Sequence, residues 1–282
     1  MNSLESGHLR RRFLEFSAFC LALTWIPWFV LGACDVNLDE GAGSLVFGLA
    51  ASGPSFAALA MFLRHRRETR PVADFRRWAG WAAGAVLSGA FASVAAAVLL
   101  NAADLSVIAD HAGSTIADVG GPLAALMFTF LAGPVAEEFG WRGYLQPRLR
   151  QSHGRVLTTV VLATGWAIWH LPLFFLEGTG QQEMRGLLFF LELFPLTYLM
   201  LFVTEHLRGG VPAAILAHAA WNFSDAVLPS LDTGGQWLRL TILTLAAVAS
   251  AAWWRGREGR AGGRAFMSWT TSPSRGGADL DC

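Results

Sequence analysis

Residues 134–144 read PVAEEFGWRGY, and the interpretation of the whole chain starts from this stretch. It places two adjacent carboxylates, Glu137 and Glu138, together with Arg142 at the end of an apolar run that begins at Gly121. On a helix, Glu138 and Arg142 stand at i and i+4 with the acid first, so we expect them to form an ion pair. Glu137 lies about 100° further round the helix and needs a partner from another part of the chain.

The composition is that of a membrane protein. Of the 282 residues, 54% are hydrophobic and 15% are charged, whereas a soluble domain has about a quarter charged residues. The net charge is zero, so no nucleic-acid partner is expected. All 21 basic residues are Arg, and Ala and Gly are abundant, which suggests a bacterial source.

Eight apolar segments are each close to the ~20 residues that cross ~30 Å of hydrocarbon. The predicted fold is therefore an all-α, polytopic bundle with spans near residues 13–33, 44–63, 80–100, 121–139, 156–176, 187–206, 211–229 and 237–254. Alternate connections hold 3, 6, 4, 1 and 5 arginines, and those between them hold 0, 0, 1 and 0. Arginine-rich connections stay in the cytoplasm, which predicts cytoplasmic termini and, for a bacterial protein, the inner membrane.

These spans divide the chain into five regions. Residues 1–12 are a cytoplasmic arm, 13–119 hold the first three spans, 120–228 hold the predicted catalytic core, 229–255 hold the last span, and 256–282 are a disordered cytoplasmic tail. One alternative is that Arg10 to Leu14 form a twin-arginine signal and that Cys34 is a lipoprotein cleavage site, which would leave seven spans.

The segment 156–176 carries Trp166 and His170, four residues apart. Trp166 is expected to stack over the ring of His170. Pro172 has no amide hydrogen, so it should free the carbonyl of Ile168 and leave a polar, irregular spot in the membrane. A packing role, with the imidazole bonded to a backbone carbonyl, explains this histidine equally well.

Further polar residues lie in the last spans. His218 and Asn222 share one face of segment 211–229. Instead of a catalytic role, the two side chains could simply form hydrogen bonds that hold neighbouring membrane helices together. Glu192 is deep in segment 187–206 and is a candidate lining residue, whereas Glu205 and His206 stand at its cytoplasmic end and should be solvated.

Taken together, the spans supply a carboxylate, two imidazoles and an amide, a set that can hydrolyse a peptide bond. Glu137 and His170 could hold and deprotonate a water molecule. His218 and Asn222 could donate to the oxyanion that forms on the carbonyl. Alternatively, Glu137, His170 and His218 could bind zinc with an open position for water, and the sequence fits either chemistry.

These residues resemble the pattern of the CPBP intramembrane proteases, also called the Abi or CAAX-protease family. The EExxxR motif is Glu137, Glu138 and Arg142; the FxxxH motif is Trp166 to His170, with Trp for Phe; the HxxxN motif is His218 to Asn222. The resemblance covers roughly residues 120–225. The chain has neither the HExxH motif of site-2 proteases nor the GxSG motif of rhomboid proteases.

The resemblance implies a membrane endopeptidase that acts on membrane proteins or peptides. It assigns Glu137 and His170 to activating water, His218 and Asn222 to the oxyanion, and Glu138 and Arg142 to support, and it leaves a zinc requirement open. Prenylated CAAX substrates are implied for the eukaryotic branch rather than for a bacterial member. Two other functions remain open: a non-proteolytic scaffold or immunity protein of the same fold, and a proton-coupled transporter that uses Glu137 and the histidines as a relay.

Overall fold

The described part of the chain is a bundle of helices without strands, as the sequence predicted. The structure is a computed structural model that describes residues 3–38, 41–65, 73–131, 133–179, 181 and 185–260. The first helices are α1 (Ser3–Ala33), α2 (Gly41–Ala51), α3 (Gly53–Arg64), α4 (Trp78–Leu100) and α5 (Ser106–Asp118). They are followed by α6 (Pro122–Leu131), α7 (Pro134–Gly140), α8 (Gln146–Ser152), α9 (Arg155–His170), α10 (Gly186–Leu201), α11 (Gly210–Val227) and α12 (Thr233–Arg260).

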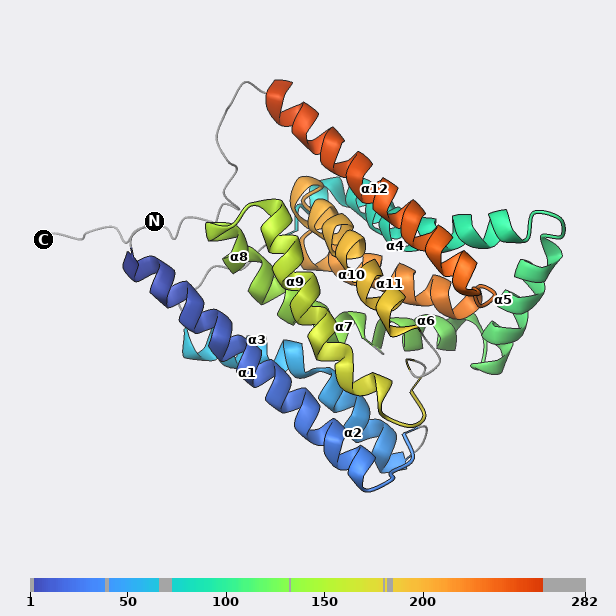
Figure 1. Ribbon diagram of the computed structural model, residues 1–282, viewed down its shortest axis with the longest axis horizontal. Helices are drawn as coiled ribbons and strands as arrows, with labels where there is room; N and C mark the ends of the chain where they lie inside the picture. Colours follow the sequence, from blue (N-terminus) through green and yellow to red (C-terminus); the bar gives the residue numbers. More distant parts are fainter. Residues whose placement is uncertain are drawn as a thin grey trace, which may run out of the picture.

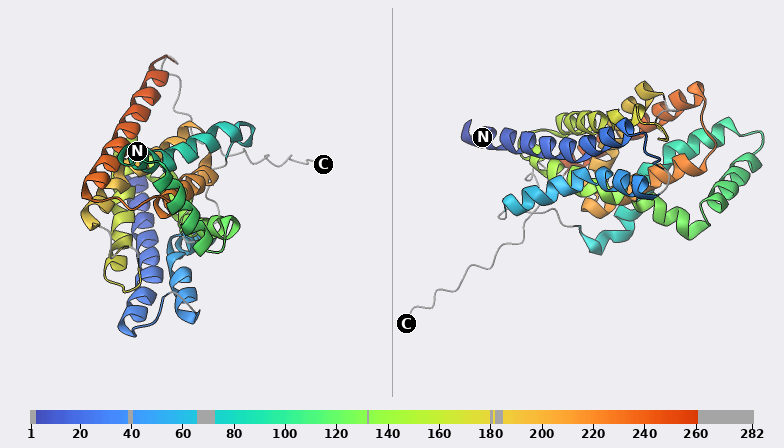
Figure 2. Two further views of the ribbon diagram at one scale, coloured as in Figure 1. Left: turned by 90° about the vertical axis from the view of Figure 1, so that its right-hand side faces the viewer. Right: turned by 90° about the horizontal axis from the view of Figure 1, so that it is seen from below.

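The helices surround a central group. Figure 1 shows α12 along one side of the bundle and α1 with α2 along the opposite side, with α9, α10 and α11 between them. Helix α11 packs along α4, α10 packs on α9 and α12, and α1 packs on α3. The right-hand view of Figure 2 places α5 at the end of the molecule away from the N-terminus.

Two of the expected spans are broken at prolines. The segment predicted as 44–63 is the pair α2 and α3, which meet at an angle of 51°, with Pro54 in the first turn of α3. The segment predicted as 121–139 is α6 followed by α7, with Pro134 in the first turn of α7. Proline lacks an amide donor, so it begins a helix more easily than it continues one.

Short turns of other helical types continue several helices. The π-helical turns η2 (Trp141–Leu145) and η5 (Phe202–His206) extend α7 and α10, and the 3₁₀ turn η3 (Leu171–Phe174) follows α9. A further 3₁₀ turn, η1 (Phe75–Arg77), precedes α4. Because π turns often occur at functional sites, the turn η2, which follows Glu137 and Glu138, indicates that α7 is part of such a site.

The apolar helices define an integral membrane protein. Among the described residues, six helices are long and apolar enough to cross a membrane, or seven if the bent pair α2 and α3 counts as one span. Eight spans were expected, and the difference is α11, whose 18 residues include His218, Asn222 and Asp225. The count of eight spans and the cytoplasmic position of both termini stay predictions.

The ends and the 101–120 connection differ from expectation. Helix α1 begins at Ser3, so most of the expected arm is helical, and α12 continues to Arg260, past the expected end of the last span. The rest of the predicted tail, residues 261–282, lies outside the described residues. Helix α5 was not expected. Asp104 stabilises its start by accepting hydrogen bonds from the Ser106 hydroxyl at 2.6 Å and amide at 3.0 Å, which also lower the pKa of that carboxyl.

Helix α1 is fixed to α9 by tryptophans. The Trp169 indole N–H donates to Thr24 Oγ1 at 2.9 Å, and the Trp25 indole N–H donates to the Trp169 carbonyl at 3.1 Å. Trp28 is fully buried and its ring lies 5.2 Å from that of Trp169. These contacts close the bundle beside the C-terminal end of α9, where His170 is located.

Candidate active site

Helix α7 places two carboxylates at the centre of the bundle. Its first turn follows Gly133, whose carbonyl accepts the amide hydrogen of Glu137 at 2.8 Å. Glu137 and Glu138 are both buried, and they point to different partners because successive helical residues differ by about 100°. Their different directions explain why the two acids can have different roles, as the sequence predicted.

Glu138 forms the predicted ion pair and also contacts a residue that was not predicted to be its partner. Arg142 Nη1 donates to Glu138 Oε1 at 2.9 Å, and neither side chain is more than 1% exposed. His218 Nδ1 lies 2.8 Å from the same oxygen. The Arg142 guanidinium also lies 4.4 Å from the centre of the Trp166 ring. Glu138 thus holds both the arginine and the imidazole of α11.

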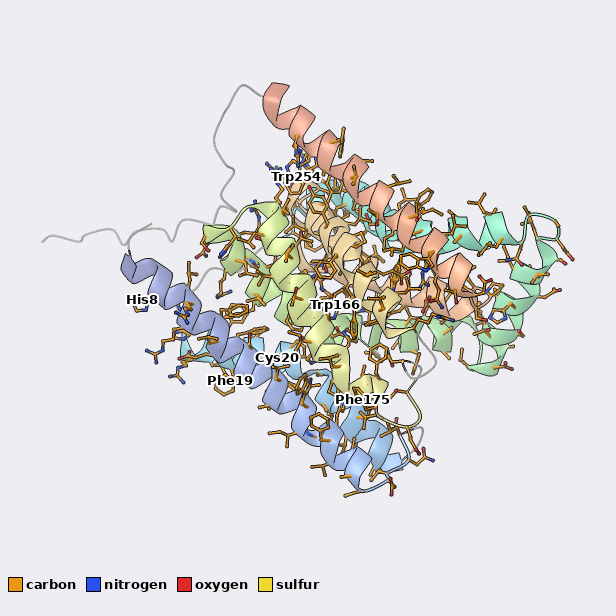
Figure 3. The ribbon with its side chains drawn as sticks, viewed as in Figure 1. His8, Phe19, Cys20, Trp166, Phe175 and Trp254 are labelled. Atoms are coloured by element: carbon orange, nitrogen blue, oxygen red, sulfur yellow. The ribbon has the colours of Figure 1, made fainter. Side chains whose placement is uncertain are left out.

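Glu137 is held by Trp166. The indole N–H donates to Glu137 Oε2 at 2.6 Å. Trp166 was expected to stack on His170, but the two rings are tilted by 57° with centres 5.6 Å apart. Stacking is lost because the indole turns toward the carboxylate, and Figure 3 shows Trp166 near the middle of the bundle. Phenylalanine, which the family motif has here, has no donor for this bond.

His170 is the last residue of α9, and one of its ring nitrogens is already hydrogen-bonded. Its Nδ1 lies 2.8 Å from the Trp166 carbonyl oxygen, an acceptor, so Nδ1 carries the proton and Nε2 is left as an acceptor in the neutral ring. The Ile168 carbonyl was expected to be free because of Pro172. Instead it accepts the Leu171 amide, because the chain tightens into a 3₁₀ turn there.

His218 and Asn222 approach Glu137 at Gly133. A methyl group placed on Gly133 would lie 3.1 Å from Glu137 Oε1, 3.4 Å from Asn222 Nδ2 and 3.8 Å from His218 Cε1. The three side chains therefore surround one small volume. Glu137 Oε1, the oxygen that is not bonded to Trp166, faces this volume.

All four predicted catalytic residues line one cavity of about 200 Å³. Its aromatic walls are Trp28, Phe47, Trp166, Trp169, Phe189 and Trp221, and its polar walls are Glu137, His170, Gln181, Arg185, Glu192, His218, Asn222, Asp225, Gln236 and Arg239. Glu138 and Arg142 are not among the lining residues, which agrees with a supporting role. The helices that contribute to the cavity wall are α1, α2, α7, α9, α10, α11 and α12.

One charged wall of this cavity was largely missed from the sequence. Arg239 of α12 contacts Glu192 through two nitrogens, at 2.7 and 2.8 Å, and also pairs with Asp225 of α11. Glu192 was considered as a lining residue, whereas Asp225 and Arg239 were not. The signal in the sequence was Arg239 itself, which stands at the start of an apolar span. An unpaired charge is costly there, so an acidic partner could have been expected.

The prediction for Glu205 was wrong. Its side chain is 8% exposed rather than solvated, and Arg150 Nε donates to its oxygens at 3.0 and 3.1 Å. The His206 ring contacts the rings of Trp253 and Trp254, with centres 4.9 and 5.1 Å away. The neighbouring helices α8 and α12 cover this end of α10, which the sequence alone did not show.

The side chains as they lie do not form a zinc site. Among the described residues, no three His, Cys, Asp or Glu side chains are grouped so that they could hold a metal ion. The zinc alternative stays a prediction.

The fold and the cavity define a class: helical membrane proteins with a buried site made of a carboxylate, two imidazoles and a carboxamide. Residues 119–224 match the family model described as Type II CAAX prenyl endopeptidase Rce1-like. The chain is also 28% identical over 109 residues to CAAX prenyl protease 2 of Methanococcus maripaludis, a match that covers 36% of this chain and 40% of that protein. The CPBP or CAAX-protease resemblance indicated by the three motifs is confirmed for this part of the chain.

Proposed function

We propose that this protein is an intramembrane endopeptidase that hydrolyses peptide bonds of membrane proteins or peptides. The observation that carries the proposal is that Glu137, His170, His218 and Asn222, from three helices, line a single cavity. The family match over residues 119–224 supports the same reaction class. The Methanococcus maripaludis relative is called a CAAX prenyl protease, so prenylated peptides are candidate substrates of this chain as well.

The first step is attack by water. Glu137 Oε1 faces the space near Asn222, because Oε2 is bonded to Trp166. We assign to Glu137 and His170 Nε2 the holding of a water molecule in the cavity and the acceptance of its proton as the oxygen bonds to the carbonyl carbon. A positioned base of this kind accelerates such a step by about 10²–10⁴-fold.

The second step stabilises the oxyanion and releases the amine. Asn222 Nδ2 is an amide donor, and it faces the same space beside Gly133 as Glu137 Oε1 does. His218 donates through Nε2 when both ring nitrogens carry protons, and Glu138 then accepts the hydrogen bond from Nδ1. These donors match the charge that forms on the carbonyl oxygen. The proton taken from water passes to the leaving nitrogen as the C–N bond breaks.

The test compares the wild-type protein with Glu137→Gln and His170→Ala in proteoliposomes. Reporter peptides with a fluorophore and a quencher are offered in three forms: membrane-anchored, soluble, and prenylated at a C-terminal CAAX cysteine. We expect cleavage of a membrane-bound form by the wild type and a loss of at least about 100-fold in both variants. Glu177→Gln and His111→Ala, at exposed positions, are the matched controls.

Three outcomes reject the proposal. Full cleavage by Glu137→Gln removes the general base from the mechanism. A cellular phenotype that survives Glu137→Gln supports the scaffold or immunity alternative. Solute flux that follows a pH gradient, with no peptide cleaved, supports the transporter. Membrane-peptide proteomics of cells with the wild type and with Glu137→Gln would identify the substrate.

A further inference from the structure

Arg239 lies where three helices of the catalytic cavity meet. It stands near the start of α12, and its guanidinium contacts Glu192 of α10 and Asp225 of α11. Figure 1 shows the start of α12 next to the end of α11, with α10 alongside. All three side chains line the cavity that contains Glu137. Asp225 and Arg239 lie outside residues 119–224, so the family match does not describe this contact.

All three nitrogens of the Arg239 guanidinium bond to acids. Nε and Nη2 donate to the two oxygens of Glu192 at 2.8 and 2.7 Å, and Nη1 donates to Asp225 Oδ1. The side chains of Glu192 and Arg239 are both largely buried. A guanidinium is planar and holds its N–H donors in a fixed fork, so it sets the direction as well as the distance of each carboxylate. Arg239 therefore fixes α11 relative to α10.

Asp225 stands where an acid is unfavourable for its own helix. It is in the last turn of α11, which ends at Val227 and has no basic residue in that turn. The carbonyl dipoles at the C-terminal end of a helix disfavour a negative charge, and the ends of helices open more easily than their middles. The contact with Arg239 compensates the charge of Asp225 and holds this end of α11 in place.

The two residues of α11 that Arg239 contacts stand on either side of Asn222 in the chain. Asp225 follows Asn222 by three residues, which places both on one side of the helix. The Arg239 guanidinium also lies 4.9 Å from the centre of the ring of Trp221, the residue before Asn222. These contacts limit the movement of the helix at Asn222 and therefore the direction of its side-chain amide.

The other side of this contact is connected to His170. Phe189 stands three residues before Glu192 on α10, and its ring centre lies 5.1 Å from that of His170. Phe189 and Glu192 both line the cavity. A shift of α11 relative to α10 would therefore change how Asn222 is placed relative to His170.

We propose that Arg239 is a positioning residue, which acts through Asp225 to hold Asn222 where its amide can donate to the oxyanion. The proposal rests on the peptidase function proposed above. In the reaction, Arg239 and Asp225 do not touch the reacting atoms. A displacement of about 1 Å at a group that contacts them can cost on the order of 100-fold in rate. Loss of the contact should therefore lower kcat and leave KM nearly unchanged.

The first test measures kcat and KM of the full-length protein in proteoliposomes with the membrane-anchored reporter. Asp225→Asn keeps the shape of the side chain without its charge, whereas Arg239→Lys keeps the charge without the planar fork. We expect each variant to lower kcat by roughly tenfold, with KM within about twofold of wild type. Asp118→Asn, at the exposed end of α5, and Arg10→Lys, at an exposed position, are the controls and should cleave at the wild-type rate. If Arg239→Lys does not fold, Asp225→Asn alone must show the loss of kcat.

A double-mutant cycle shows whether Asp225 acts through Asn222. Asp225→Asn is made in the wild type and in Asn222→Ala, and the residual cleavage is compared. If Asp225 positions Asn222, the change should slow the wild type by roughly tenfold and Asn222→Ala by less than about twofold. Equal factors in both backgrounds overturn the proposal, because they show a general loss of structure.

Hydrogen–deuterium exchange adds a measurement that needs no cleavage. We expect the amides of residues 219–228 to exchange severalfold faster in Asp225→Asn, and those of residues 155–170 to keep the wild-type rate. Unchanged exchange at residues 219–228 overturns the proposal, and so does a raised KM with the wild-type kcat, because Asp225 would then bind substrate. If the wild type cleaves no reporter, the peptidase function fails and the positioning role fails with it. A wild-type kcat in Asp225→Asn, beside a wild type that cleaves, rejects the positioning role alone.

Discussion

The indole nitrogen of Trp166 lies 2.6 Å from Glu137 Oε2, so the residue that departs from the family motif holds the carboxylate on which the proposed mechanism depends. The bond fixes which oxygen faces the cavity. It also explains why the indole does not stack on His170, since one ring cannot satisfy both contacts.

Replacing Trp166 by Phe should slow cleavage without unfolding the protein. The ring remains aromatic, and the hydrogen bond to Glu137 is lost, which for a charged acceptor costs about 1.5–3 kcal/mol. We expect kcat to fall by roughly tenfold or more, with KM changed less. Trp237→Phe, at a residue 48% exposed, is the matched control. Unchanged kcat in Trp166→Phe would show that the bond has no positioning role.

Replacing Glu138 by Ala should destabilise the protein. The change leaves the Arg142 charge and the His218 ring nitrogen without their buried acceptor. Removing one partner of a buried pair costs about 3–5 kcal/mol. Thermal unfolding in detergent measures the change, and Glu177→Ala, at an exposed position, should have little effect. Equal unfolding temperatures for the two variants would contradict the supporting role of Glu138.

Replacing Gly133 by Ala should reduce the rate of peptide cleavage. The added methyl group would lie 3.1 Å from Glu137 Oε1 and 3.4 Å from Asn222 Nδ2, where water and substrate must enter. A displacement of about 1 Å at a reacting group can cost on the order of 100-fold in rate. Gly113→Ala, where the same methyl would meet no atom within 4 Å, should cleave at the wild-type rate. Wild-type activity in Gly133→Ala would place the reaction elsewhere in the cavity.

Replacing Gly89 by Ala should weaken the contact between α4 and α11. A methyl group on Gly89 would lie 2.1 Å from the Ala217 carbonyl oxygen, so the helices would have to move apart. Overpacking of this kind costs about 1–3 kcal/mol. Because α11 carries His218 and Asn222, activity should fall as well. Gly80→Ala is on the same helix, meets no atom within 4 Å, and is the control for both measurements.

Replacing Arg239 by Met should destabilise the wall of the catalytic cavity. Glu192 is 3% exposed and would lose both of its contacts with the guanidinium, and Asp225 would lose its partner. A cost of about 3 kcal/mol or more is expected when a buried acid loses its cation. Thermal unfolding measures it, with Arg10→Met at an exposed position as the reference. An unfolding temperature equal to that of the reference would show that α12 is held by its apolar contacts alone.

The sequence determined the helical class of this protein and much of its site. Apolar segments of membrane-spanning length predicted the helices, because a backbone in lipid must satisfy its hydrogen bonds within the helix. The i, i+4 spacing of Glu138 and Arg142 predicted their ion pair, because that contact depends on the geometry of one helix. The prolines at 54 and 134 were a local signal for the breaks in two spans, but the apolar pattern continues across both prolines and predicted unbroken spans.

Contacts between helices were decided by the tertiary structure. That His218 contacts Glu138 rather than Glu137, that Trp166 turns to Glu137, and that Glu205 is covered all depend on how helices cross and rotate against each other. The pairing of Arg239 with Glu192 joins residues 47 positions apart. Spacing along one helix fixes which residues share a face, but the partner that meets this face is set by the packing of the whole bundle.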